Sequence, residues 1–226
     1  MILEDVLGAV QALAAPTFLS AGTGGQEKPL SGTMQVPYPA TVAAGNFLLL
    51  QVYASDSGQG PSVTTPSGWT LIKNQTGATP GAMHASYKIA TGSESGNLDV
   101  TVSAADAFAA GRIYRFSGGL SFEAAGSAIT TASATAMTCV DLTTLGAQRL
   151  AVQLFGATVN TTIGNISGET NADYTEAVAE YADTGPVTLS CQIATIAAAI
   201  AISGGSATLG AAGTDRVRIG FAITPP

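Results

Sequence analysis

The sequence predicts an all-β protein: an antiparallel two-sheet β-sandwich, jelly-roll or immunoglobulin-like in style, with a short N-terminal amphipathic helix. Three observations predict it. Short strand-like runs recur along most of the 226 residues, turns rich in Gly, Pro, Ser and Asn separate them, and their spacing is typical of sandwiches and barrels. The connections are short and no linker divides the chain. We therefore expect a helical arm over residues 1–15 and a single sandwich domain over residues 16–226.

Helical periodicity predicts the arm. Its apolar residues recur at spacings of three and four, Glu4 and Asp5 favour the positive end of a helix dipole, and Pro16 stops the helix. A helix this short is marginal in water and must pack on something, either its own domain or a partner subunit or scaffold. The candidate docking residues are Ile2, Leu3, Val6, Leu7, Val10 and Leu13.

Strands are expected in order after the arm. Residues 17–20 form the first candidate strand, the glycine-rich residues 22–32 a loop or edge excursion, and the apolar run 47–53 a central strand. Further strands of the first half are predicted at residues 70–73, 83–90, 98–103 and 112–116, and those of the second half at residues 136–142, 149–157, 187–193, 197–202 and 216–223.

One segment of the second half has two possible structures. The carboxylates Asp173, Glu176, Glu180 and Asp183 fall at spacings of three and four. This pattern fits either a helix with one solvated acidic face or an irregular polar strand. The apolar run 193–202, bounded by Ser203-Gly204-Gly205, is interpreted as a buried strand.

The composition is poor in charge. Charged residues make up 10% of the chain, against roughly 25% in ordinary globular proteins, and the net charge is −7. Such a surface suits a particle-exposed setting or an oligomer that covers much of each subunit. Nucleic-acid binding needs a basic face, whereas the closest basic groupings are Arg112 with Arg115 and Arg216 with Arg218. We expect no nucleic-acid partner.

Membrane insertion and signal-directed export are not expected either. The longest apolar run, residues 193–202, is shorter than the ~20 residues that a bilayer requires. Glu4 and Asp5 stand where a signal peptide would be basic, so we expect synthesis in the cytoplasm without export by that route. Cys139 and Cys191 are predicted to be buried free thiols, because proteins made in the cytoplasm seldom carry structural disulfides.

The residues that carry chemistry predict no enzyme, cofactor or metal site. His84, the only histidine, is expected at a surface or sheet edge, and the chain has no Gly-x-Ser-x-Gly elbow. Calcium at the acidic residues 173–183 is the minor alternative to a solvated face, since the usual loop pattern is missing. Carboxylates that could serve glycoside hydrolysis lack flanking aromatic residues; they are Glu94, Glu123, Glu169, Glu176 and Glu180.

Glycines and the single tryptophan are interpreted structurally. Residues 22–25 and 203–206 are glycine-rich but precede no helix with Lys-Ser/Thr, so they are expected to be turns rather than phosphate cradles. Trp69 follows a Pro-Ser-Gly turn and opens a strand. Core packing is favoured for this side chain, and stacking on a sugar is the alternative.

The order and spacing of four motifs resemble a family of β-sandwich proteins encoded by tailed bacteriophages and prophages. The motifs are Pro66-Ser67-Gly68-Trp69-Thr70-Leu71-Ile72, Tyr87-Lys88-Ile89-Ala90-Thr91-Gly92-Ser93-Glu94, Arg112-Ile113-Tyr114-Arg115-Phe116-Ser117-Gly118 and Ile219-Gly220-Phe221-Ala222-Ile223-Thr224-Pro225. The resemblance covers most of residues 36–226 and excludes the arm. It implies a virion structural role in capsid decoration, a head fibre or the tail surface, and it implies no catalytic residues.

We therefore expect a virion protein made in the host cytoplasm and placed on the exterior of a tailed phage. A capsid decoration or cement protein is favoured, with phage capsid or tail proteins as partners and a homo-oligomer, preferably a trimer. The alternative is a receptor-binding module of a tail or head fibre that recognises host-surface glycan through loops around Tyr174, Tyr181 and Asp183.

Overall fold

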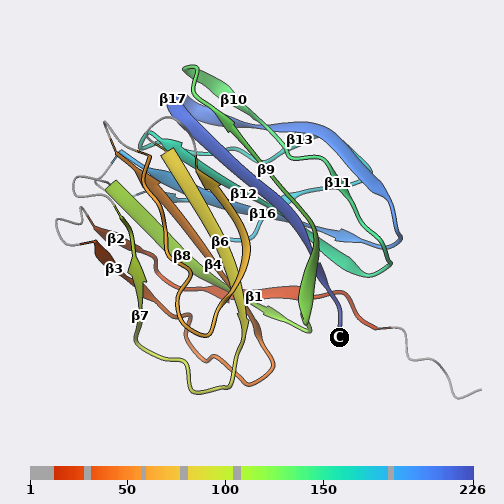
Figure 1. Ribbon diagram of the computed structural model, residues 1–226. Helices are drawn as coiled ribbons and strands as arrows, with labels where there is room; N and C mark the ends of the chain where they lie inside the picture. The colour runs from red at the N-terminus through yellow and green to blue at the C-terminus, as the bar shows by residue number, and fades with distance from the viewer. Residues whose placement is uncertain (1–12, 28–31, 57–59, 77–80, 104–107, 183–185) are drawn as a thin grey trace, which may run out of the picture.

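The computed structural model describes residues 13–27, 32–56, 60–76, 81–103, 108–182 and 186–226 (Figure 1). These residues form antiparallel sheets and contain no helix, which confirms the all-β class and is consistent with a β-sandwich. The predicted helix lies almost wholly outside the described residues, including its docking positions Ile2, Leu3, Val6, Leu7 and Val10. The sixth, Leu13, is described and is 54% exposed.

The first half of the chain builds a six-stranded sheet in the order β1-β8-β4-β6-β5, with β2 beside β8. A separate two-stranded sheet, β3 with β7, packs on its outer face. The strands are β1 (Thr17–Ala21), β2 (Gly25–Glu27), β3 (Thr33–Pro37), β4 (Phe47–Ser55), β5 (Thr70–Thr76), β6 (Gly81–Ile89), β7 (Asn97–Thr101) and β8 (Phe108–Ser117).

The second half builds a nine-stranded sheet along the path β10-β17-β12-β16-β14, and β9, β11 and β13 also pair with β17. The strands are β9 (Ser121–Thr130), β10 (Ala134–Thr138), β11 (Leu142–Thr143), β12 (Arg149–Thr158), β13 (Ser167–Thr170), β14 (Thr175–Glu176), β15 (Tyr181–Ala182), β16 (Thr188–Ile196) and β17 (Ala201–Thr224). Between the two large sheets the chain crosses once, through residues 118–120.

Three apolar clusters hold these layers together. The central cluster lies between the two large sheets, a second lies between the first sheet and the β3–β7 pair, and a third covers the outer face of the second sheet. Side chains alternate between the faces of a strand, so β4 feeds two clusters: Phe47 and Leu49 enter the central one, and Leu48 and Leu50 the second. This double burial explains why the β4 sequence is a continuous apolar run.

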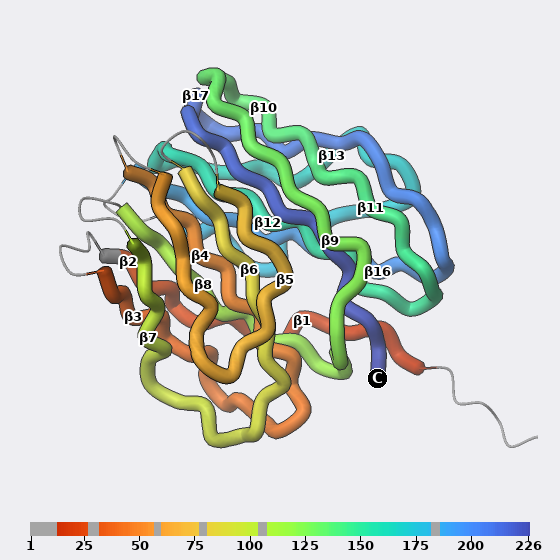
Figure 2. The backbone as a smooth tube through the Cα atoms, viewed as in Figure 1, coloured from red at the N-terminus to blue at the C-terminus, as the bar shows by residue number. Residues whose placement is uncertain are grey.

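The edges of the two large sheets meet on one side of the sandwich, where β9 lies against β5 (Figure 2). Ser127 of β9 donates a hydrogen bond from Oγ to Gln75 Oε1 of β5. On another side, Arg112 of β8 donates from Nη1 to the carbonyl of Ala179 in the second half (2.7 Å). These contacts join the two halves of the chain.

Several local predictions need correction. The run 193–202 is not one strand: β16 ends at Ile196, and β17 begins at Ala201 after an exposed turn. Residues 203–206 are not a terminating turn either, because β17 continues through Gly204 and Gly205, which adopt φ values of 74° and 77°. Only glycine adopts such angles freely, so these residues let the long strand bend.

The structure decides between the alternatives expected for two more segments. The glycine-rich loop 22–32 contains β2, and residues 173–183 form the short strands β14 and β15, as in the irregular-strand alternative. Asp183 itself lies outside the described residues. In the part of the chain that the structure describes, no helix is long and apolar enough to cross a membrane.

Candidate functional site

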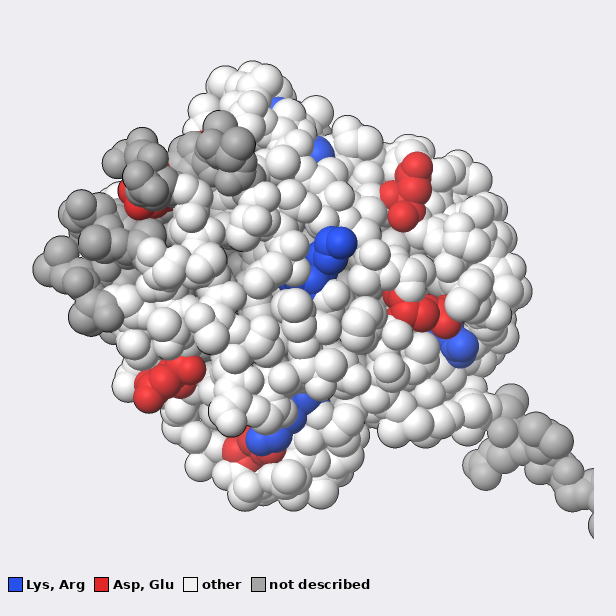
Figure 3. All heavy atoms as spheres, in the orientation of Figure 1, with Lys and Arg blue, Asp and Glu red and all other residues white. Residues whose placement is uncertain are grey.

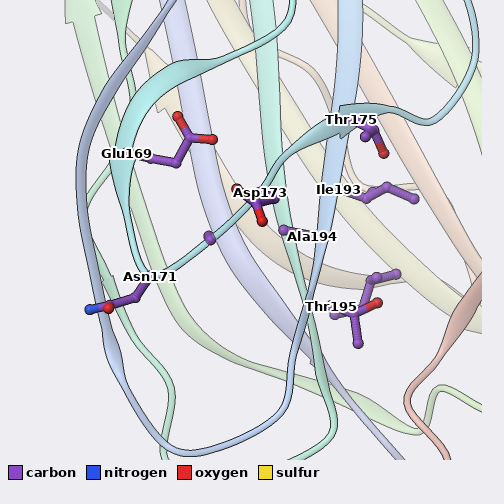
Figure 4. A pocket seen from close by; sticks show the side chains of 9 residues that line it. Glu169, Asn171, Asp173, Thr175, Ile193, Ala194 and Thr195 are labelled. Atoms are coloured by element: carbon purple, nitrogen blue, oxygen red, sulfur yellow. The ribbon is translucent and has the colours of Figure 1, made fainter.

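A cavity of about 520 Å³ opens on the second sheet, between β16 and the connection from β13 to β14 (Figure 4). Figure 4 shows Glu169, Asp173, Thr175 and Thr195 around it. The lining residues are Leu150, Glu169, Asn171, Ala172, Asp173, Thr175, Ile193, Ala194 and Thr195.

The β13–β14 connection is held in place by its own polar groups. Asn171 has a φ of 66°, and its Nδ2 donates to the carbonyl of Ala201 (2.9 Å). Glu169 Oε1 accepts a hydrogen bond from the backbone N–H of Tyr174 (3.4 Å), and the Tyr174 ring is buried in the third apolar cluster. The side chains of Glu169 and Asn171 are therefore held in place on one side of the cavity, opposite β16 (Figure 4).

The lining combines hydrogen-bonding groups with apolar ones. Two carboxylates, one amide and two hydroxyls stand beside Leu150, Ile193 and Ala194, and no residue that lines the cavity is basic. Cavities that mix apolar surface with a few convergent polar groups are the usual form of small-ligand sites. The arrangement suits a neutral ligand rich in hydroxyl groups, or one that carries a positive charge.

The residues proposed for glycan recognition are not arranged as an open aromatic platform. Tyr174 is 5% exposed and is buried in the third apolar cluster, and it does not line the cavity. Tyr181 is half-buried; its ring packs against Gly24, and the Arg112 guanidinium carbon lies 6.0 Å from the ring centre. Sequence reasoning missed Asn171 and Thr195, because the cavity joins segments far apart in the chain.

His84 is fully buried on the inner strand β6, which corrects the predicted surface or edge position. Asn74 Oδ1 accepts its Nδ1–H (2.9 Å), whereas Nε2 has no hydrogen-bond partner and is buried. Desolvation lowers the pKa of His84 to about 4, so the ring is neutral near pH 7. An amide rather than a carboxylate orients this ring, unlike in a hydrolytic triad.

The candidate carboxylates serve several different contacts. Glu94 forms an ion pair with Lys88 (2.8 Å), and Glu123 forms one with Arg149 (3.0 Å). Burial, and then the charge of Glu180, raise the pKa of Glu176. Of the five predicted candidates, Glu169 alone lines the cavity. Within the described ranges, no group of three or more His, Cys, Asp or Glu side chains is placed to hold a metal ion.

The cysteines and Trp69 agree with their structural interpretations. Cys139 and Cys191 are free thiols, as predicted, although Cys139 is only partly buried. Burial raises the pKa of both, that of Cys139 to about 12, so neither is a reactive thiolate near pH 7. Trp69 is 8% exposed in the second apolar cluster, which confirms core packing.

Two of the motifs behind the phage resemblance meet at one end of the first sheet. The Trp69 N–H donates to the carbonyl of Pro66 (3.1 Å), closing a turn in which Gly68 has a φ of 78°. Tyr38, which packs on the same cluster as Trp69, lies within electrostatic range of Lys88 and Glu94 in the second motif. These two motifs therefore have a structural role, in which they hold turns against the neighbouring strands.

Comparisons of the chain with protein-family models, with curated proteins and with solved structures found no match.

Proposed function

We propose that the chain is a virion structural protein on the exterior of a tailed phage particle, as a capsid decoration or cement protein. The observation that carries the proposal is the charge-poor surface of a layered β-sandwich. The face in Figure 3 is almost entirely uncharged, with a few acidic and basic groups, some of them adjacent to one another. Some charges of the described residues are neutralised within ion pairs: Lys88 pairs with Glu94, and Arg149 pairs with Glu123. The motif resemblance supplies the link to phages.

The proposed mechanism is adhesion by burial of apolar surface and sheet edges. Strand β1 is an edge strand of the first sheet and carries no charged residue. Proteins usually cover an edge of this type. Large apolar side chains also stand exposed at Leu13, Leu19, Leu71, Leu120 and Leu145. A homo-oligomer, preferably a trimer, would cover such edges, and the arm at residues 1–15 would dock the protein on capsid or tail subunits.

We also propose that the sandwich is jelly-roll or immunoglobulin-like in style. Jelly-roll and immunoglobulin-like sandwiches are common architectures of exposed protein modules. The layered body supports this style, although here each large sheet comes from one half of the chain.

The test is the location and copy number of the protein on intact particles. Immunogold label spread over the head, with hundreds of copies by quantitative gel, supports decoration, and no label on any particle overturns the virion role. Deletion of residues 1–14 should abolish attachment, whereas Gln35→Ala, a change at an exposed polar residue outside the arm, should leave particles decorated. Full decoration by the deletion variant would overturn the docking role of the arm.

The cavity supports a second candidate, a receptor-binding module that recognises host-surface glycan. Its hydroxyl, amide and carboxylate groups are of the kinds that hydrogen-bond sugar hydroxyls. A glycan array with the wild-type protein and with Asn171→Ala decides this candidate. Specific binding that is lost in the variant supports it, and an array without hits overturns it. A few copies at the tail tip or on fibres would also favour this role over decoration.

A further inference from the structure

Two arginines are buried side by side on strand β17. Arg216 is 3% exposed and Arg218 is 6% exposed. Their separation by one residue places both on the same face of the strand. That face is opposite to the one from which Val217 and Ile219 enter the central cluster. The two guanidinium groups therefore share one environment, beside the β9–β10 hairpin.

The hydrogen-bond partners of the two guanidinium groups are neutral. Arg216 donates from Nη1 to the carbonyl of Ala136 and from Nη2 to that of Ala132 (2.8 Å), and Arg218 donates from Nη2 to Thr130 Oγ1 (2.9 Å). The Nε atoms of both arginines are buried and have no acceptor. Carbonyl and hydroxyl oxygens satisfy part of the donor set, but they do not neutralise two positive charges.

No carboxylate in the described part of the chain pairs with these arginines, since its ion pairs are Lys88–Glu94 and Arg149–Glu123. Asp215 is next in sequence, but it packs against Gly81 of the first sheet. The Cys139 thiol nearby is neutral because burial raises its pKa. Two unpaired buried charges are strongly unfavourable, and such charges normally have a counter-charge.

Burial disfavours the charged form of both arginines, and the charge of Arg216 further disfavours that of Arg218. Desolvation lowers the pKa of Arg216, and desolvation together with the charge of Arg216 lowers that of Arg218. Arginine remains protonated in proteins even so, so the pair keeps its charge. An anion of charge near −2 that accepts several N–H groups would compensate both residues.

We propose that Arg216 and Arg218 form an anion site for a small oxyanion of the phosphate or sulfate class, at the junction of β17 and the β9–β10 hairpin. Guanidinium groups present planar N–H forks that match the oxygens of such anions. The site is independent of the cavity at Glu169 and Asp173, because none of its residues lines that cavity. Its occupant would fix the hairpin on the second sheet.

The test is the thermal stability of the full chain during titration with inorganic phosphate, with chloride at matched ionic strength as the reference. Binding to the native state raises the Tm in proportion to the logarithm of the phosphate concentration once that concentration exceeds Kd, and the increase is roughly 5–10 °C at a hundredfold excess over Kd. General salting effects of phosphate instead grow in proportion to its concentration. A Tm that rises linearly with the phosphate concentration, or a Tm equal to that in chloride, would overturn the proposal.

Variants locate the effect. Arg218→Met should lose the logarithmic increase in Tm and, without phosphate, should be at least as stable as the wild type. The matched control is Arg112→Met, which should keep the increase: Arg112 also donates to carbonyls, but it lies within electrostatic range of Glu176. An increase retained in Arg218→Met would place phosphate elsewhere and overturn the site. If Arg218→Met does not fold, calorimetric titration of the wild-type protein with phosphate still tests the proposed anion site. No heat of binding together with no increase in Tm would reject that site.

Discussion

The side-chain amide of Gln153 hydrogen-bonds both backbone polar groups of Val140. Gln153 Nε2 donates to the Val140 carbonyl (2.8 Å), and its Oε1 accepts the Val140 N–H (3.2 Å). Gln192 holds another outer segment in the same way, donating to the carbonyl of Gly164 (2.9 Å) and accepting the N–H of Ile166 (2.7 Å). Both glutamines are fully buried. Each amide substitutes for a missing strand neighbour, so the outer segments stay attached to the second sheet.

Replacement of Gln153 by leucine should therefore be costly. The variant leaves the N–H and the carbonyl of Val140 without these partners, and each buried unsatisfied group costs about 1–3 kcal/mol. We expect a loss of roughly 2–4 kcal/mol in the free energy of unfolding, measured by urea denaturation. Gln35→Leu is the control, because Gln35 is exposed and its variant should change stability by no more than about 0.5 kcal/mol. Equal effects of the two variants would contradict the role assigned to Gln153.

Acid should destabilise the protein through His84. Its pKa is about 4 in the folded state against an ordinary value near 6.5, so between these pH values the unfolded chain binds a proton that the native state excludes. Stability is then complete above about pH 6.5 and falls as the pH drops toward 4, by up to about 1.4 kcal/mol per pH unit. His84→Gln should remove this slope, measured as unfolding free energy at a series of pH values. An unchanged slope in the variant would show that other groups cause the acid lability.

Glu94 should act in a lower pH range. Burial acts to raise its pKa, but hydrogen bonds from Lys88 and from Thr91 outweigh that effect and hold the pKa at about 2. The stabilisation from Glu94 is therefore present above about pH 4.5 and is lost as the pH falls toward 2. Glu94→Gln should lower the free energy of unfolding at pH 7 by about 1.5–3 kcal/mol, the range for hydrogen bonds to charged groups. The difference between variant and wild type should vanish near pH 2, and a pH-independent difference would refute the assignment.

Substitution of Trp69 separates a core role from a sugar-stacking role. The ring packs with Leu48, Leu50 and Val63, and truncation of a buried tryptophan to alanine costs about 3–5 kcal/mol. Trp69→Ala should therefore lower the free energy of unfolding, measured by urea denaturation, by about that amount. Trp69→Phe should lower it by less. A variant that keeps its stability but loses glycan binding would favour the stacking role instead.

The sequence predicts the parts of the fold that carry a strong local pattern of apolar residues or of turn residues. The apolar runs of β4 and β12 identify inner strands, and the predicted turns of the first half fall close to the observed ones. Strand β9 was missed because its sequence, rich in Ala, Ser and Gly, resembles a loop. The burial of His84 was also missed, because no local signal shows that β6 lies between β4 and β5. The cavity was not predictable, since it forms only where Leu150, residues 169–175 and residues 193–195 meet.

Strand β17 has a consequence for synthesis of the protein. It follows every other described strand in the sequence, yet it lies between β9 and β12 inside its sheet. During translation the first sheet can pair completely before β17 is made, whereas the second sheet lacks an inner strand until β17 has left the ribosome. Until then the inner face of the first sheet, with Phe47 and Tyr114, is only partly covered. A nascent chain stalled before β17 would expose that face to aggregation, so the pairing of β17 is the step that covers the central cluster.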